Sequence, residues 1–552
     1  MSAPAASRPS TAAFALMAAG LGLAFAAWSL PANLRSTNPA LLRAAGADTP
    51  TLGGFGRDLV DLEKIGPAAL VLAAARATDD PRAPALASAL ETFAARQPAL
   101  VAWGGWDPFL DPLFNLRSDS GHRTSTPVLT FLIPEQSRDK LRASLANSGS
   151  LGVQLLLKLR GLTATGRFVP AARAGGQPLD ALILLSALLY QGERFAPPLQ
   201  RELRALADAA LEKQQLGELE PFFIDLLSLG RRLDWTQLSE LLHRTESTKT
   251  VGKFAQLARV TPGELPVIYS AALFSDSADR VAGYLIQYGK NGLADLRLAL
   301  ADGQGAVKEL LVRDAPVNHS AGVVLGAATT FALWHTQLTL VLKYLGYMLG
   351  AWLVLRGLDR ALVGVFDRTR PFDAFAHMKS GALAVIFGGL LIVATEPFLL
   401  RAAPASEYQL RLRVPVLVAT TEISPPEKSQ TTTTMDFSTL LSIGLFASLQ
   451  VAMYFTCLVK IREVSRQAVP PLVKLKLMDN EENLFDGGLY VGIAGTATAL
   501  VLQVLRIIEP NLLAAYASNL FGIICVALVK IRHVRDYKRQ LILEAQAEAK
   551  LT

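Results

Sequence analysis

The sequence predicts a mainly α-helical fold: a six-span α-helical membrane protein with a large, mostly helical exported domain. Of 552 residues, 51% are apolar and 18% are charged, whereas soluble globular chains carry about 25% charged residues. The mean hydropathy is +0.31. The apolar residues gather in long runs, and a helix of roughly 20 such residues crosses a bilayer. The high apolar content and the 2 cysteines also exclude a disordered chain and a disulfide scaffold.

The net charge of +7 is unevenly distributed along the chain. Residues 31–320 hold 31 basic and 30 acidic side chains, so nearly all of the excess lies in and beside the apolar stretches. Basic residues that flank apolar segments orient a protein in the membrane. This distribution predicts contact with membrane lipid and no binding of nucleic acid.

Six stretches are long and apolar enough to span a membrane. They cover residues 12–30, 322–355, 380–400, 437–459, 487–508 and 511–529. The second is too long for one crossing and contains His335 and Lys343. We therefore expect its first turns to lie outside the membrane, with Lys343 snorkelling or facing the bundle interior. Glu396 lies close to Arg401 in sequence, a spacing that favours an interfacial ion pair between them.

The basic residues predict one orientation. Segment 356–379, segment 460–486, the tail from residue 530 and Arg8 together hold 17 basic residues, whereas the short loops of the other side hold 5. Because basic loops stay in the cytoplasm, we expect both termini there and residues 31–320 outside. This indicates a bacterial inner (plasma) membrane protein with a periplasmic domain.

The first apolar segment has two interpretations. It follows Arg8 and contains the small-residue sequence Ala24-Phe25-Ala26, as a cleaved secretory signal does. Its uncharged stretch is also long enough for a retained anchor. Both interpretations export residues 31–320. Cys457 and Cys525 fall inside expected spans and are interpreted as small apolar residues.

The expected organisation has six parts. They are an anchor or signal (1–30), the exported helical domain (31–320), spans two and three (321–400), an outer loop with a strand (401–436), spans four to six (437–530) and a basic helical tail in the cytoplasm (531–552). The strand is expected at 408–418, where apolar and polar residues alternate.

The exported domain shows helical periodicity with turn residues between the periodic segments. The clearest helices cover 199–211, 221–229, 235–243 and 278–288, with Asp234, Ser277 and Asn291 as candidate caps. One apolar run at 126–133 predicts a strand, and with it a possible small α+β part. Residues 188–203 resemble residues 226–241 at an offset of 38, which suggests helical repeats that stack into a binding scaffold.

The sequence carries no recognisable catalytic or metal motif, so no catalytic residue, metal ligand or cofactor is predicted. Its 6 histidines include no metal-spaced pair, and no nucleophile elbow is present. The cluster around Trp103 and Trp106 is either an exposed patch that docks a partner or sugar, or a loop packed into the domain core. Asp107 and Asp111 beside it are the first candidates for carboxylate chemistry if the domain is an enzyme.

The last two spans carry small and polar residues at helical spacing, which lets helices approach closely in lipid. We interpret them as a helix interface or as the lining of a pore. The residues concerned are Gly488, Gly492, Gly495, Thr496, Gln503, Ser518 and Gly522.

The segment Gly492-Ile-Ala-Gly-Thr496, which opens a span after a cytoplasmic loop, resembles the G-L-L-G-T signature of the MotA/TolQ/ExbB proton-channel family. The following run from Ala515 to Gly522 is similar to that family's next span. The resemblance covers about 40 residues of spans five and six. It implies that Thr496 and Ser518 line a central path in an oligomer. The family's acidic residue in the last span has no counterpart here.

Three functions fit these features. The first is a scaffold or energy-coupling subunit of an envelope complex, a homo-oligomer or an assembly with membrane and periplasmic proteins, whose exported domain binds periplasmic partners. The second is a stand-alone transporter or channel. The third is an envelope enzyme with its site in residues 31–320.

Overall fold

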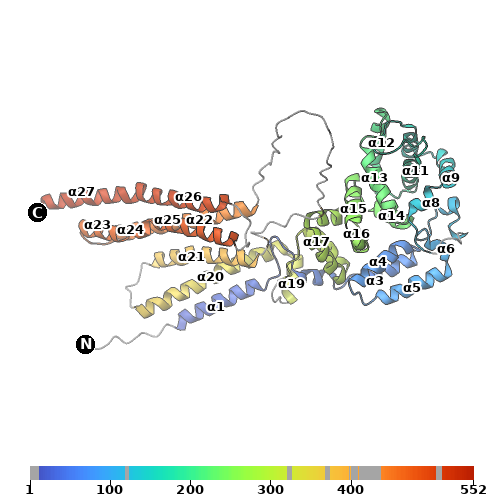
Figure 1. The fold of residues 1–552 in the computed structure, drawn as a ribbon. Coiled ribbons are helices and arrows are strands. Elements are labelled where there is room, and N and C mark those ends of the chain that lie inside the picture. Colours follow the sequence, from blue (N-terminus) through green and yellow to red (C-terminus); the bar gives the residue numbers. More distant parts are fainter. Residues whose placement is uncertain are drawn as a thin grey trace. The chain divides into compact units, whose positions relative to one another are not determined.

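The computed structural model describes residues 11–118, 124–319, 326–366, 373–396, 398, 408, 437–504 and 512–551. The chain divides into two compact units. Unit 1 comprises Met1–Ser36, Ser320–Ala403 and Pro415–Thr552, and unit 2 comprises Thr37–His319 and Pro404–Val414. The mainly helical fold is confirmed in both units (Figure 1).

Unit 2 is a stack of helices joined by short turns, with 3₁₀ turns at Leu116–Ser118, Leu159–Gly161 and Pro262–Glu264. Its helices are α2 (Pro39–Gly46), α3 (Leu52–Asp61), α4 (Ile65–Ala77), α5 (Ala83–Arg96), α6 (Pro98–Val101), α7 (Asp111–Phe114), α8 (Val128–Leu132), α9 (Glu135–Ala146), α10 (Leu151–Lys158), α11 (Gln177–Gln191), α12 (Pro197–Glu212), α13 (Leu219–Gly230), α14 (Trp235–His243), α15 (Thr248–Val260), α16 (Leu265–Ser275), α17 (Ala278–Asp302) and α18 (Gln304–Arg313).

The core of unit 2 is centred on helices that are apolar on nearly every side. Every residue of α11 from Leu179 to Leu189 is buried, and α16 is buried from Val267 to Phe274. A helix that is apolar all round has to be covered by others. Other helices of the unit bury one apolar face each, as α12 does with Leu199 and Leu203.

The helix predictions for unit 2 are largely confirmed. The expected helices at 199–211, 221–229 and 235–243 correspond to α12, α13 and α14. Asp234 and Ser277 are N-caps whose side chains accept hydrogen bonds from backbone N–H groups of the first turn. The expected helix at 278–288 is the first part of α17, and the expected cap at Asn291 is wrong, because Asn291 lies inside the second part, which continues to Asp302. The interruption is instead at Gly289, which has φ +58°.

The strand expected at 126–133 is wrong, and with it the α+β part. Residues Val128–Leu132 form helix α8 between Pro127 and Pro134. One helical turn buries Val128, Leu129 and Leu132 together in the core, which a strand of this length with no neighbouring strand could not do. Only two isolated bridges, Thr37 with Val317 and Ala164 with Gln215, occur in the described part of the chain.

The two segments related by the offset of 38 residues share one local structure. Residues 188–203 contain the end of α11, a turn and the start of α12, and residues 226–241 contain the end of α13, a turn and the start of α14. Pro197, the first residue of α12, aligns with Trp235, the first residue of α14. The sequence match therefore marks two helix–turn–helix corners in the same register.

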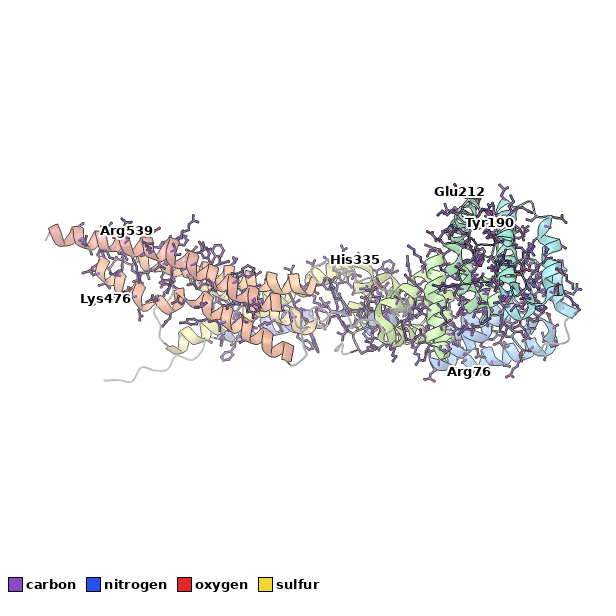
Figure 2. The ribbon with its side chains drawn as sticks, turned by 45° about the horizontal axis from the view of Figure 1, so that its top comes forward. Arg76, Tyr190, Glu212, His335, Lys476 and Arg539 are labelled. Atoms are coloured by element: carbon purple, nitrogen blue, oxygen red, sulfur yellow. The ribbon has the colours of Figure 1, made fainter. Side chains whose placement is uncertain are left out.

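Unit 1 consists of long apolar helices and shorter polar ones. They are α1 (Thr11–Trp28), α19 (Gly326–Trp334), α20 (Thr336–Phe366), α21 (Asp373–Thr395), α22 (Phe437–Arg466), α23 (Pro471–Asn480), α24 (Glu482–Phe485), α25 (Gly487–Val504), α26 (Leu512–Ala527), a π-helical segment (Leu528–Val534) and α27 (Arg535–Leu551). Figure 2 shows the basic side chains of Lys476 and Arg539 at one end of unit 1 and His335 at the other.

The prediction of six spans is not supported. Among the described residues, three helices are long and apolar enough to cross a membrane: Thr11–Trp28, Thr336–Ala361 and Tyr516–Ala547. The long second stretch breaks at His335, so α19 lies before the candidate span, as expected. Helix α21 begins at Asp373 and ends at Thr395, and its continuous apolar part, Leu383–Val393, is shorter than the three candidate spans.

Helices α1 and α20 pack together antiparallel through small residues. A Cβ atom placed on Gly20 would lie 2.6 Å from the Gly350 carbonyl oxygen, and one on Gly346 would lie 2.7 Å from the Ala27 Cβ. Such contacts bring two helix backbones against each other. The first apolar segment is therefore an integral part of the unit 1 helix packing.

The strand expected at 408–418 lies outside the described residues, except for Tyr408. Tyr408 belongs to unit 2, where its side chain is buried and its carbonyl oxygen accepts a hydrogen bond from the Gln256 side chain of α15.

Candidate functional site

The loop that carries Trp103 and Trp106 packs into unit 2. Trp103 is 3% exposed and stacks on Phe131, with ring centroids 4.1 Å apart. Trp106 is half-buried, and the Arg117 guanidinium lies 5.4 Å from its ring centroid. Trp103 is therefore not a surface group, which favours the interpretation of a loop packed into the core. Partner binding by Trp106 stays a prediction.

The two glycines between the tryptophans allow this loop to reach the start of α14. Gly104 has φ +80°, and a Cβ atom there would lie 2.2 Å from the Asp234 carboxylate. The Gly66 N–H donates to the Gly104 carbonyl oxygen at 2.6 Å. Asp234 is fully buried, and burial raises its pKa to about 7, although the Gln237 N–H and the Ser125 hydroxyl donate to its carboxylate.

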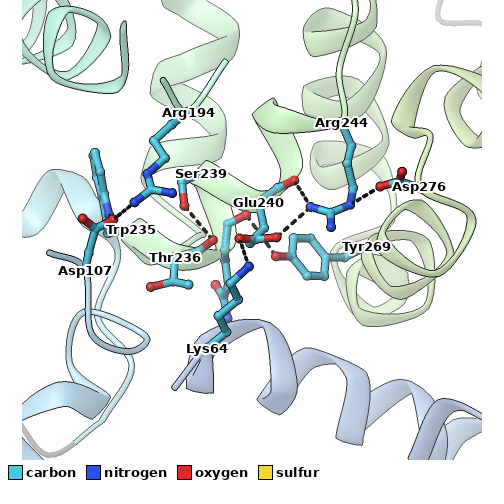
Figure 3. Close-up of polar contacts among 11 residues, drawn as sticks. Lys64, Asp107, Arg194, Trp235, Thr236, Ser239, Glu240, Arg244, Tyr269 and Asp276 are labelled. Atoms are coloured by element: carbon cyan, nitrogen blue, oxygen red, sulfur yellow. Dashed lines mark hydrogen bonds and ion pairs between the residues drawn. The ribbon is translucent and has the colours of Figure 1, made fainter. Parts of the chain in front are cut away.

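Asp107 is a structural carboxylate, and its buried side chain is saturated with donors (Figure 3). It accepts hydrogen bonds from the Trp235 indole N–H at 2.7 Å, from Arg194 Nη2 at 2.8 Å and from the Phe109 N–H at 2.8 Å. A carboxylate held this way has no free oxygen at a surface to take a proton from a substrate. Asp111, at the start of α7, makes none of these contacts. The pair therefore does not form a carboxylate site.

A second charged cluster surrounds Glu240 on α14 (Figure 3). Lys64 Nζ lies 2.6 Å from Glu240 Oε1, and Arg244 Nη1 lies 2.7 Å from Oε2. Arg244 also contacts Asp276, with its Nε 2.9 Å from Oδ1. Burial opposes ionisation of Glu240, but the hydrogen bonds and charges of Lys64 and Arg244 outweigh it and lower its pKa. The ion pairs of this cluster join α4, α14 and the α16–α17 turn, and its acidic and basic side chains neutralise one another.

Unit 2 also carries an open groove of about 670 Å³ between α15, α17 and α18. Its lining includes Lys253 of α15, Arg280 and Tyr284 of α17, and Leu311 and Val312 of α18. The groove is within the size range of ligand sites, about 300–1,000 Å³. Unlike the two clusters above, it presents charged side chains to solvent.

In unit 1, a buried ion pair joins the ends of three helices. Lys343 and Glu396 have side chains that are 3% and 1% exposed, with Nζ 3.6 Å from Oε1. Lys343 Nζ also donates to the Ala32 carbonyl oxygen at 2.7 Å and to Asn33 Oδ1 at 2.6 Å. Glu396 further accepts from the Tyr344 hydroxyl at 2.9 Å and from the Leu34 N–H at 3.2 Å. All charges in this cluster have partners.

The Lys343 side chain is buried inside unit 1, which fits the expectation that it faces the bundle interior. The partner of Glu396 is Lys343, where the sequence spacing favoured Arg401, which lies outside the described residues. The cluster fixes the segment after α1 to α20 and to the end of α21.

The small-residue face of the last helices is packed inside the chain. A Cβ atom on Gly492 would lie 3.0 Å from the Ser518 carbonyl oxygen, and one on Gly522 would lie 2.6 Å from the Gly488 carbonyl oxygen. A Cβ atom on Gly495 would lie 2.4 Å from Ser518 Oγ. These residues therefore serve as the contact between α25 and α26.

The polar residues of this face bond mostly to nearby backbone. The Thr496 hydroxyl donates to the Gly492 carbonyl oxygen at 3.0 Å, and the Ser518 hydroxyl reaches the same oxygen at 3.3 Å. Gln503 lies in α25, but its side chain is outside the described ones. Gln450 of α22, which the sequence interpretation left out of this face, donates to the Gly488 carbonyl oxygen at 3.0 Å.

Comparisons with protein-family models, with curated proteins and with solved structures gave no match. Within the described residues, no group of three or more His, Cys, Asp or Glu side chains is arranged to hold a metal ion.

Sequence reasoning missed the partners in both charged clusters of unit 2. Asp234 was found as a cap, because Asp followed three positions later by Gln is a capping box pattern. Arg194 and Lys64 carried no local signal, since each meets a carboxylate that is far away in the chain.

Proposed function

We propose that this protein is a membrane-anchored scaffold subunit of a bacterial envelope complex, whose exported helical unit binds partner proteins. Unit 1 holds the protein in the inner membrane, and unit 2 lies in the periplasm. The protein works by binding and positioning partners, and not by catalysis in unit 2.

The observation that carries this proposal is the repeated helix–turn–helix corner in unit 2, at α11–α12 and again at α13–α14. Stacked helix pairs of this kind form extended surfaces that bind proteins. The buried charged groups between them, Asp107 and Glu240, are fully used in holding helices together. Buried carboxylates that are engaged in this way suit a binding role better than acid–base chemistry.

Exposed apolar side chains support the membrane location of unit 1. They occur on the three candidate spans and also on α21, α22 and α25, for example Phe387, Phe455 and Ile493. In lipid, such side chains need no protein cover. The basic side chains Lys476 and Arg539 gather at one end of unit 1 (Figure 2), as the cytoplasmic end of a membrane protein does.

Tyr408 supports a crossing by both α20 and α21. It belongs to unit 2 together with His319, so the chain must be on the same side of the membrane at both positions. An even number of crossings must then lie between them. Helices α20 and α21, which pack as a pair, supply two.

Photo-crosslinking in cells tests the scaffold function. A crosslinking amino acid is placed at exposed positions of unit 2, one at a time, and adducts are identified by mass spectrometry. The proposal predicts discrete protein adducts from one face of unit 2, with envelope proteins as the partners. Absence of any adduct from all faces, combined with measurable turnover of an envelope substrate by purified protein, would replace the scaffold with the enzyme.

A channel is the second candidate, and one observation favours it. Gln450 Oε1 and Asn519 Oδ1 are buried between apolar helices without a hydrogen-bond partner among the described residues. Unpaired carboxamide oxygens at such a depth are costly unless water or an ion reaches them. Native mass spectrometry of the detergent-solubilised protein distinguishes the candidates. A defined homo-oligomeric ring favours the energy-coupling channel, whereas a monomer with bound partners favours the scaffold.

A further inference from the structure

The open groove of unit 2 brings two cations, Lys253 and Arg280, into one lining. Elsewhere, partly buried arginines contact carboxylates, as Arg160 does with Asp180 and Arg194 does with Asp107. The side chains of Lys253 and Arg280 contact no carboxylate in the described part of the chain. They come from two helices, α15 and α17, and both line the groove. The groove lining holds these two cations and one carboxylate, Asp314.

The same groove has an apolar wall. Leu311 and Val312 of α18 and Ile286 of α17 line it, and Val312 is 65% exposed. A large aliphatic side chain exposed beside these two cations suits a ligand with both apolar and anionic groups. An inorganic anion would satisfy the cations but leave this wall in water.

We propose that the groove binds an acidic peptide segment of a partner protein in which aliphatic residues alternate with carboxylates. The carboxylates pair with Lys253 and Arg280, and the aliphatic side chains cover Leu311 and Val312. This assignment rests on the proposed scaffold function and names the kind of segment that unit 2 recognises.

Asp314 sharpens the specificity of the groove. It caps α18 with a left-handed backbone (φ +45°) and places its exposed side chain at the groove lining. Its carboxylate repels a uniformly anionic polymer, whereas a peptide can place an N–H group or a basic residue opposite it. A peptide of mixed character therefore fits better than a nucleic acid strand.

Gly283 provides a clean way to block the groove. It lies in α17 among the lining residues, and a Cβ atom placed there meets nothing within 4 Å. We therefore expect Gly283→Leu to place its side chain in the groove without disturbing the fold. Gly149, between α9 and α10, also has open space around it and lies outside the groove, so Gly149→Leu is the matched control.

The test uses full-length protein in detergent and a short fluorescein-labelled peptide in which Glu and Leu alternate. Fluorescence anisotropy is measured for the wild type, Gly283→Leu, Gly149→Leu and the double variant Lys253→Glu/Arg280→Glu. We expect the peptide to bind the wild type and the Gly149→Leu protein equally, and to bind both groove variants about tenfold or more weakly. A peptide with Gln in place of Glu should bind weakly to all four proteins. Added salt should weaken the binding of the Glu peptide to the wild type.

Equal affinity of the Glu peptide for the wild type and Gly283→Leu would overturn the groove assignment, and so would equal affinity of the Gln and Glu peptides. The scaffold function is separable from this result. If the crosslinked partners of unit 2 persist in the Gly283→Leu protein, partner binding stands and only its location in this groove fails. If no partner is found for the wild type either, the scaffold itself fails.

Discussion

The two units of this protein use glycine and buried charge in different ways. In unit 2, Gly104 and Gly105 have positive φ and shape a loop, and the buried carboxylates each gather two or more donors. In unit 1, glycines such as Gly20 and Gly350 lie in regular helix and bring backbones into contact. Its buried cluster at Lys343 and Glu396 ties three chain segments together.

This difference follows from the solvent that each unit faces. In water, burial of large apolar side chains drives helix packing, and unit 2 uses glycine both in loops with positive φ, as at Gly104, and at close contacts inside helices, as at Gly56. In lipid there is no such drive between helices, and close packing with a few polar contacts has to replace it.

The largest effect is expected at the buried ion pair of unit 1. Glu396→Leu leaves the Lys343 ammonium in a buried position without a counter-charge. We expect a loss of about 3–5 kcal/mol in the free energy of unfolding, because an uncompensated buried charge is strongly destabilising. Titration of the detergent-solubilised protein with sodium dodecyl sulfate, followed by helix content, measures it.

A double variant gives the control for this prediction. Lys343→Met combined with Glu396→Leu removes both charges and should recover most of the lost stability. If the double variant is as unstable as the sum of the two single variants, the pair is not coupled and the cluster holds unit 1 through Tyr344 and the backbone contacts alone.

The second effect is a pH dependence confined to unit 2. The pKa of Asp234 is about 7 in the folded protein and about 3.9 in an unfolded chain. Between these values the folded state binds the extra proton, so the free energy of unfolding falls as pH rises from about 4 to about 7, by up to about 1.4 kcal/mol per pH unit.

Asp234→Asn isolates this contribution, because asparagine keeps the N-cap but does not titrate. As pH rises from about 4 to about 7, the free energy of unfolding of the variant should increase relative to that of the wild type. Above about pH 7 the difference between the two proteins should stay constant. Denaturation followed by tryptophan fluorescence reports it. A constant difference from pH 4 to pH 8 would mean that Asp234 stays ionised in the fold.

The third effect compares two glycines of α1. Gly20→Leu drives a side chain into the Gly350 backbone, and overpacking of this kind costs about 1–3 kcal/mol. Gly22→Leu, two residues later, has nothing within 4 Å and should be neutral. The same detergent titration measures both. Equal behaviour of the two variants would show that α1 does not rest on α20, as expected for a segment that is cleaved.

The sequence predicts the helices of unit 2 better than the contacts between them. The positions of α12, α13 and α14 could be predicted from the sequence, because the spacing of apolar residues and caps such as Asp234 depend only on residues nearby in the chain. The strand at 126–133 failed because Val128 and Leu129 are buried by helices distant in sequence, which overrides local preference. The Lys343–Glu396 pair was equally invisible, since only folding brings α20 and α21 together.

The sites show the same limit. The small-residue face at Gly488, Gly492 and Ser518 could be read from its spacing, and the structure places it between two helices of one chain. Spacing alone does not say which helix will cover such a face. The groove at Lys253 and Arg280 could not be predicted from the sequence, because its two cations come from separate helices and neither belongs to a local motif.

The smallest expected effect is the change in stability when a helical glycine is replaced by alanine, which should differ between the two units. Gly283→Ala in α17 of unit 2 adds a methyl group in open space and reduces the freedom of the unfolded chain, so it should stabilise unit 2 by about 0.5–1 kcal/mol. Gly444→Ala in α22 of unit 1, which also has nothing within 4 Å, should change stability less, because in lipid a helix keeps its backbone hydrogen bonds whatever its residues. Thermal unfolding of each variant, followed by helix content, measures the two shifts. Equal gains would mean that α22 is limited by helix propensity as a water-exposed helix is, and would argue against placing it in the membrane beside α26.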